Sequence, residues 1–129
     1  MFDTAWKQKY ETGHARIDFE HRVFLDLIDQ FASEAANSEP SRRLVRLCAE
    51  LYKYADFHFF SEEGLMEDAG YAGLTQHHKL HAELLSSLRT FIESVSLDHF
   101  MVNQMVDFLI TWFVTHTTSE DVKFTAKVK

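Results

Sequence analysis

Apolar residues recur every three or four positions along four long segments of this chain, and polar residues lie between them. That spacing places the apolar side chains on one face of an α-helix. We expect helices over about residues 18–37, 42–69, 74–95 and 97–117. Only four glycines and one proline interrupt the 129 residues, which favours long helices over a fold of many strands. The pattern therefore predicts an all-α protein.

Three short connections join these predicted helices. The first contains Pro40, which disfavours helical geometry at the residue before it, and the second begins at Gly70, a residue type that often follows the last turn of a helix. Short connections make successive helices antiparallel neighbours. The expected architecture is an antiparallel up-down-up-down four-helix bundle.

Residues 1–16 do not share the helical pattern. We expect them to form an irregular N-terminal arm, anchored by Trp6 and Tyr10. The sequence has no internal repeat and no low-complexity tract, so residues 1–129 are interpreted as a single domain.

Charge and composition exclude several classes of partner. The formal net charge is −7 and the basic residues form no run beyond Arg42 and Arg43, so nucleic acid and anionic membranes are not expected partners. No apolar stretch approaches the roughly 20 residues of a membrane span, and residues 1–10 lack a secretory pattern. The expected location is the cytoplasm. Cys48, the only cysteine, excludes an internal disulfide.

Five of the eight histidines fall on the apolar faces of the predicted helices, where an up-down-up-down bundle brings them to one end. They are His21, His58, His81, His116 and one of the adjacent pair His77 and His78. One histidine on an apolar face is usually a hydrogen-bonded core residue. Five at one end would bury many polar groups without evident partners, unless a metal binds them.

Two carboxylates complete a candidate two-metal site. Glu62 follows His58 by one helical turn, and Asp121 follows His116 by five residues. A spacing of five turns two side chains about 140° apart on a regular α-helix, so Asp121 reaches the site only if the helix ends or bulges near residues 117–119. Each carboxylate has two oxygens and can bridge two ions. Imidazoles with carboxylates suit iron, zinc, copper or nickel rather than calcium or magnesium.

Four short motifs together resemble the hemerythrins, and in particular the bacterial hemerythrins. They are Ile17 to His21 (IDFEH), His58 to Glu63 (HFFSEE), His77 to His81 (HHKLH) and Trp112 to His116 (WFVTH), followed by Asp121. The likeness covers Trp6 to about Phe124, and it selects His77 rather than His78 as a ligand. It implies a non-haem di-iron protein with seven metal ligands: His21, His58, Glu62, His77, His81, His116 and Asp121.

The resemblance also implies how these ligands are shared. One iron would be held by His77, His81 and His116 and the other by His21 and His58. Glu62 and Asp121 would bridge both irons, together with an oxo or hydroxo group. Dioxygen would bind at the open position of the two-histidine iron, in a pocket of aromatic residues: Phe24, Phe59, Trp112 and Phe113. Phe113 stands where the family usually has leucine.

From this resemblance we expect a protein that binds dioxygen reversibly, for storage, delivery or scavenging, and that is not an enzyme. The alternative is the oxygen-sensing or redox-sensing input domain of a larger protein, with a signalling domain beyond the C-terminus. A peroxidase, a nitric-oxide-handling or iron-storing enzyme and a structural zinc bundle are weaker alternatives. The other titratable groups nearby are expected on the surface: His14, His78, His99, Glu63, Glu67 and Asp68.

Overall fold

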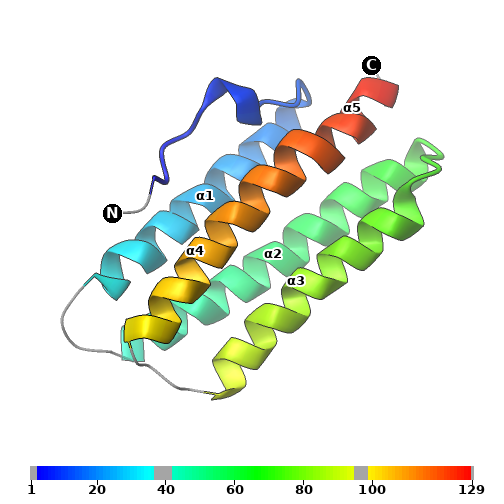
Figure 1. Cartoon of the computed structure of the whole chain (residues 1–129). Helices are drawn as coiled ribbons and strands as arrows, with labels where there is room; N and C mark the ends of the chain where they lie inside the picture. Colours follow the sequence, from blue (N-terminus) through cyan, green and yellow to red (C-terminus); the bar gives the residue numbers. More distant parts are fainter. Residues whose placement is uncertain (1–2, 37–41, 95–98, 129) are drawn as a thin grey trace.

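Four long helices run side by side in alternating directions (Figure 1). The computed structural model describes residues 3–36, 42–94 and 99–128, without the side chains of residues 94, 99–101 and 128. The four helices are α1 (Ala15–Ala35), α2 (Arg42–Asp68), α3 (Leu74–Ser94) and α4 (His99–Thr115). These described residues contain no strand. The expected antiparallel four-helix bundle is confirmed.

The helix bounds lie within a few residues of those expected. α1 begins at Ala15 because His14 caps it: the Nδ1 atom of His14 accepts a hydrogen bond from the backbone N–H of Ile17 at 3.4 Å. His14 is therefore a half-buried helix cap and not a surface residue of the arm. At the end of α2, Gly70 has a positive φ of 66°, which glycine adopts without strain. The expected bounds at residues 37, 95 and 97, and the side chain of His99, lie outside the described part of the chain.

The helical path continues beyond α4. A π-helical segment, η2 (His116–Asp121), follows α4 directly, and a short helix, α5 (Val122–Val128), follows η2. In Figure 1 the three segments form one rod, coloured from yellow through orange to red. The expected end of the fourth helix near residue 117 is thus a change of helix type, after which helical hydrogen bonding resumes.

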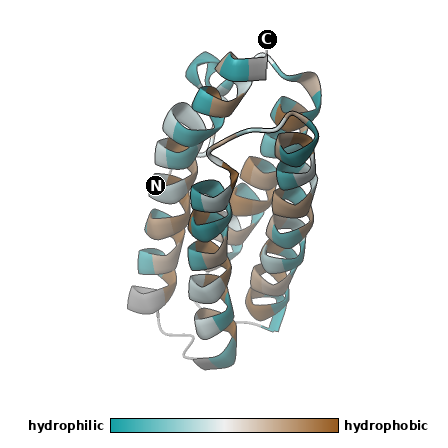
Figure 2. Ribbon diagram, turned by 90° about the vertical axis from the view of Figure 1, so that its right-hand side faces the viewer, coloured by the Kyte–Doolittle hydropathy of each residue, from teal (hydrophilic) through white to brown (hydrophobic). Residues whose placement is uncertain are grey.

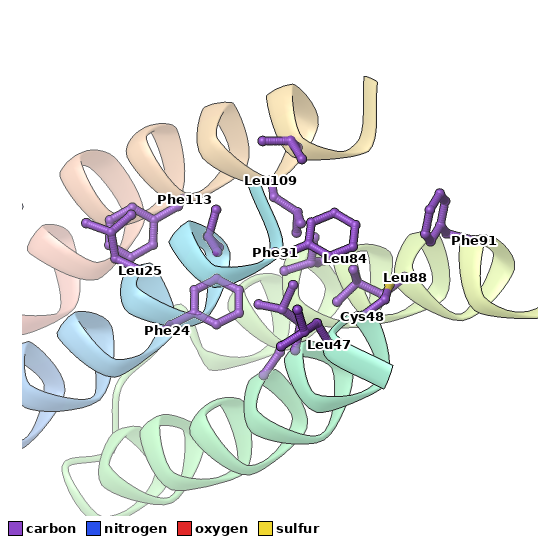
Figure 3. Close-up of a cluster of buried hydrophobic side chains, with 14 of the residues drawn as sticks. Phe24, Leu25, Phe31, Leu47, Cys48, Leu84, Leu88, Phe91, Leu109 and Phe113 are labelled. Carbon is purple, nitrogen blue, oxygen red and sulfur yellow. The ribbon is translucent and has the colours of Figure 1, made fainter. Parts of the chain in front are cut away.

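The apolar faces of the helices meet along the bundle axis, and Figure 2 shows hydrophilic residues on the outward faces. The main core joins buried side chains from all four helices, and Phe31 and Phe91 pack edge to face within it (Figure 3). A smaller cluster of Ile17, Met66 and Phe124 lies nearer the end of the bundle that carries α5. Burial of apolar surface contributes about 25 cal/mol per Å² to folding. The two clusters leave a layer between them, and this layer contains the polar side chains described below.

The N-terminal arm contains one short 3₁₀ turn, η1 (Gln8–Tyr10). Tyr10 is buried and contacts Trp6 and Phe113 edge to face, with ring centroids 5.5 and 5.3 Å apart. The Arg22 guanidinium lies 4.2 Å from the Trp6 ring centroid, a cation–π contact. The expected anchoring of the arm by Trp6 and Tyr10 is confirmed. No helix in the described ranges is long and apolar enough to cross a membrane.

Candidate metal centre

Seven polar side chains converge between the two apolar clusters. They come from the start of α1, the later part of α2, the start of α3, and both ends of η2. Each is at most 5% exposed: His21, His58, Glu62, His77, His81, His116 and Asp121. The structure therefore brings together every residue that the sequence placed in one site, including His77, whereas His78 is exposed.

Three imidazoles form one side of this cluster. The Nε2 atom of His116 lies 3.0 Å from Nε2 of His77 and 3.1 Å from Nε2 of His81. One donor atom from each of these histidines, and from Glu62 and Asp121, lies within 4.8 Å of the others. Five nitrogen and oxygen donors thus surround one small volume, which suits a transition-metal ion.

Two further imidazoles form the other side. His21 and His58 meet at a ring-centroid distance of 4.7 Å. Their donor atoms and one oxygen of Glu62 also lie within 4.8 Å of one another. This second group has fewer donors than the first, so a metal ion there has room for a further ligand.

The two carboxylates lie between these groups and present one oxygen to each. Oε1 of Glu62 is 2.8 Å from Nε2 of His77, whereas Oε2 is 3.8 Å from Nε2 of His21 and 3.7 Å from Nε2 of His58. Oδ1 of Asp121 is 2.9 Å from Nε2 of His77, and Oδ2 is 3.0 Å from Nε2 of His21. Carboxylates in this position can bridge two metal ions.

Three buried oxygen atoms of the cluster also favour the binding of a pair of metal ions. Oε2 of Glu62 and both carboxylate oxygens of Asp121 are buried and, within the described residues, have no hydrogen bond of acceptable geometry. Unsatisfied buried oxygens cost free energy unless a cation or another partner binds them. Coordination of metal ions would satisfy these oxygens.

The π-helical segment η2 explains how His116 and Asp121 reach the same site. A π-helix has more residues per turn than an α-helix, so a spacing of five brings two side chains to nearly the same face. The hydroxyl of Thr118 in this segment donates a hydrogen bond to the carbonyl oxygen of Val114, in the last turn of α4, at 2.7 Å. Of the two possibilities expected near residues 117–119, a helix end or a bulge, the structure has the bulge, and both side chains are buried in the bundle.

Burial and the neighbouring charges shift the pKa values of these groups. Burial disfavours the ionised form of Asp121, but His116, His21 and His77 hold the pKa of its carboxyl well below the usual range. Burial lowers the pKa of His77, but its close contacts and charge interactions with the Asp121 and Glu62 carboxylates raise it to about 9. Burial and the charge of Asp121 raise the pKa of Glu62, but His77, His81 and His58 lower it below its usual value, so both carboxylates are ionised at neutral pH and available as ligands.

Two carboxylates outside the group of seven were missed from the sequence. Oε1 of Glu20 is 2.7 Å from Nδ1 of His58, and Oε2 of Glu63 is 2.7 Å from Nδ1 of His81. The expectation that Glu63 belongs to a solvated face is therefore wrong, although Glu67 and Asp68 are exposed as expected. The only available signal was that Glu20 and Glu63 each adjoin a candidate ligand in the sequence.

Aromatic side chains line a small cavity beside the cluster. Phe24, Phe59, Trp112 and Phe113 line a cavity of about 10 Å³, together with His21, His58 and His116. That volume is close to the minimum for one water molecule. Phe59 stacks on His81 at a centroid distance of 3.8 Å, and Trp112 stacks on His116 at 4.3 Å. The cavity is thus small and mostly apolar.

Comparison with known proteins gives a consistent result. The family model described as the hemerythrin HHE cation binding domain matches residues 12–128. The bacteriohemerythrin of Clostridium acetobutylicum is 27% identical over an alignment of 125 residues that covers 93% of this chain and 97% of that protein. The myohemerythrin of Theromyzon tessulatum is 25% identical, over 95% of this chain and 92% of its own. The myohemerythrin of Riftia pachyptila is also 25% identical, over 93% of this chain and 89% of its own.

Proposed function

The chain belongs to the hemerythrin family, and we propose that it binds dioxygen reversibly at a centre of two iron ions. The observation that best supports this is the placement of Glu62 and Asp121, each of which directs one oxygen toward each histidine group. Two bridging carboxylates and five imidazoles would hold two ions a few ångströms apart. The iron pair would supply the two electrons that binding draws onto dioxygen and that release returns.

The two histidine groups are proposed to bind different metal ions. His77, His81 and His116 would hold one ion, which with both carboxylates has five protein donors. His21 and His58 would hold the other, which has four protein donors. Dioxygen is expected on the side with fewer donors. The aromatic cavity reaches that side, because His21 and His58 both line it, whereas His116 is the one histidine of the other group that does so.

Phe24, Phe59, Trp112 and Phe113 are proposed to shield the bound dioxygen from water. Phe113 is 1% exposed, and its ring lies edge to face with that of His21, at a centroid distance of 5.6 Å. A buried apolar surround limits the entry of water and protons, which would otherwise help dioxygen to leave in a reduced form. Reversible release of dioxygen is then favoured over oxidation of the iron.

Binding is favoured over oxidative catalysis by the ligand types. Di-iron enzymes built on helical bundles use Glu-x-x-His pairs directed into the core. The Glu-x-x-His run of this chain, from Glu11 to His14, lies before α1. There the Glu11 carboxylate pairs with Arg22 at 3.1 Å, and His14 caps the helix. Neither residue joins the metal cluster.

The direct test is reconstitution of metal-free protein with ferrous iron under argon. We expect about two irons per chain and a visible absorption band that appears in air and disappears when oxygen is removed. A zinc-loaded sample serves as the control, because zinc has no redox chemistry. One iron per chain, or no oxygen-dependent band, would contradict the proposal.

A further inference from the structure

The ring of His81 is held from two directions that have different effects. Phe59 stacks on its face, with the two ring planes only 5° apart. This contact fixes the plane of the imidazole, but a flip of 180° about the Cβ–Cγ bond leaves that plane unchanged. Stacking alone therefore does not decide whether Nε2 or a ring carbon faces the metal centre.

The hydrogen bond to Glu63 makes that choice. An ionised carboxylate can only accept, so the 2.7 Å contact requires Nδ1 of His81 to carry the hydrogen. In the neutral ring, Nε2 then has the free lone pair. That atom lies 3.3 Å from Oε1 of Glu62 and 3.1 Å from Nε2 of His116. One contact outside the cluster thus sets both the orientation and the tautomer of His81.

Glu63 differs from the corresponding carboxylate of the other group. Glu20 is buried, and it accepts further hydrogen bonds from Ser61 and Arg16, each at 3.0 Å. Glu63 is partly exposed, and its other oxygen bonds Nδ1 of the exposed His78 at 2.6 Å. It also lines a surface groove of about 430 Å³. Of these two outer carboxylates, only Glu63 lies where solvent can reach it.

We propose that Glu63 is a positioning residue for the three-histidine metal position, acting through His81, and that it tunes this position independently of the other. The proposal rests on metal binding at the centre, which is part of the proposed function, but it requires neither iron nor dioxygen. Loss of such an outer hydrogen bond typically lowers metal affinity by about 10- to 100-fold. The effect should be confined to one of the two ions.

The test is a zinc titration of metal-free protein against a competing chelator, which measures the two dissociation constants separately. Glu63→Ala should lower the affinity for one zinc ion by about 10- to 100-fold and change the affinity for the other by no more than about threefold. Glu63→Gln keeps an oxygen that accepts from Nδ1 and should recover much of the loss. Glu67→Ala is the matched control, because this exposed glutamate lies one turn further along α2 and also borders the groove. Its two zinc affinities should match those of the unchanged protein.

A second measurement separates positioning from general stability. NMR of the zinc-loaded protein labelled with ¹⁵N in histidine should show the Nδ1–H proton of His81 exchanging faster with water in Glu63→Ala, while that of His58 is unchanged. Equal affinities in Glu63→Ala and Glu67→Ala would overturn the proposal, as would equal weakening of both zinc ions. Equal losses in Glu63→Ala and Glu63→Gln would also overturn it. If instead these zinc results hold and the iron protein fails to bind dioxygen, only the proposed function is wrong.

Discussion

Replacement of Phe113 by alanine should affect both the stability of the bundle and the lifetime of bound dioxygen. The ring is 1% exposed and packs against Tyr10, His21 and Phe24. Truncation of a buried phenylalanine to alanine typically costs about 3–5 kcal/mol of unfolding free energy. That is a large part of the roughly 5–15 kcal/mol available to a domain. Phe113→Leu removes less volume and should cost about 1–2 kcal/mol.

The second effect follows from the size of the cavity beside the ring. A volume of about 10 Å³ accepts at most one water molecule, and removal of the ring should admit more. We expect the oxygen-dependent absorption of Phe113→Ala to decay at least about tenfold faster at fixed pH, which requires the barrier to fall by only about 1.4 kcal/mol. Phe113→Leu should decay at an intermediate rate. Iron content should stay near two per chain in both variants, because no proposed ligand is lost.

Phe31→Ala separates the two effects. Phe31 is equally buried, but it packs against Phe91 in the main core and does not line the cavity. The Phe31→Ala variant should lose a similar amount of unfolding free energy, measured in urea. Its oxygen-dependent absorption should decay at the same rate as that of the unchanged protein. Unchanged decay in both Phe113 variants would show that the ring does not shield dioxygen. Equally fast decay in Phe31→Ala would show that loss of stability, and not access of water, sets the rate.

Three further outcomes are expected. His58→Ala should lower the iron content below two per chain, and it should lower the melting temperature because metal binding is coupled to folding. The control is Asp56→Ala, at an exposed position on the same helix, which should retain about two irons by metal analysis. In metal-free protein, the raised pKa of His77 stabilises the fold fully below pH 6.5, which is near the pKa of the unfolded residue, and this stabilisation is lost as the pH rises toward about 9. The urea midpoint of unfolding should therefore fall across this pH range, and a rise would contradict the assignment. Gly64→Ala should raise the unfolding free energy by about 0.5–1 kcal/mol, because nothing lies within 4 Å of the added methyl group and glycine is unfavourable inside a helix; a lower urea midpoint would refute this.

The helices and their order could be predicted from the sequence because they depend on short-range periodicity. Apolar side chains at intervals of three and four identify the inward face of each helix, and connections of a few residues leave little choice but antiparallel neighbours. The same logic placed His21, His58, His81 and His116 at one end of the bundle. It also required the helix to end or bulge before Asp121, because a regular α-helix could not direct both Asp121 and His116 inward.

The contacts around the imidazoles depended on the tertiary structure. Glu20 and Glu63 adjoin His21 and Glu62 in the sequence, yet each contacts a histidine of another helix. In sequence alone, only its position beside Glu62 distinguishes Glu63 from Glu67, which lies on the solvent-exposed surface. Which of them meets an imidazole depends on the rotation and axial position of α3 relative to α2. One residue turns a helix by 100° and advances it by 1.5 Å, and an apolar pattern does not define a helix position that finely. Hydrogen bonds form only within about 0.5 Å of their preferred length, so packing of the whole bundle decides them.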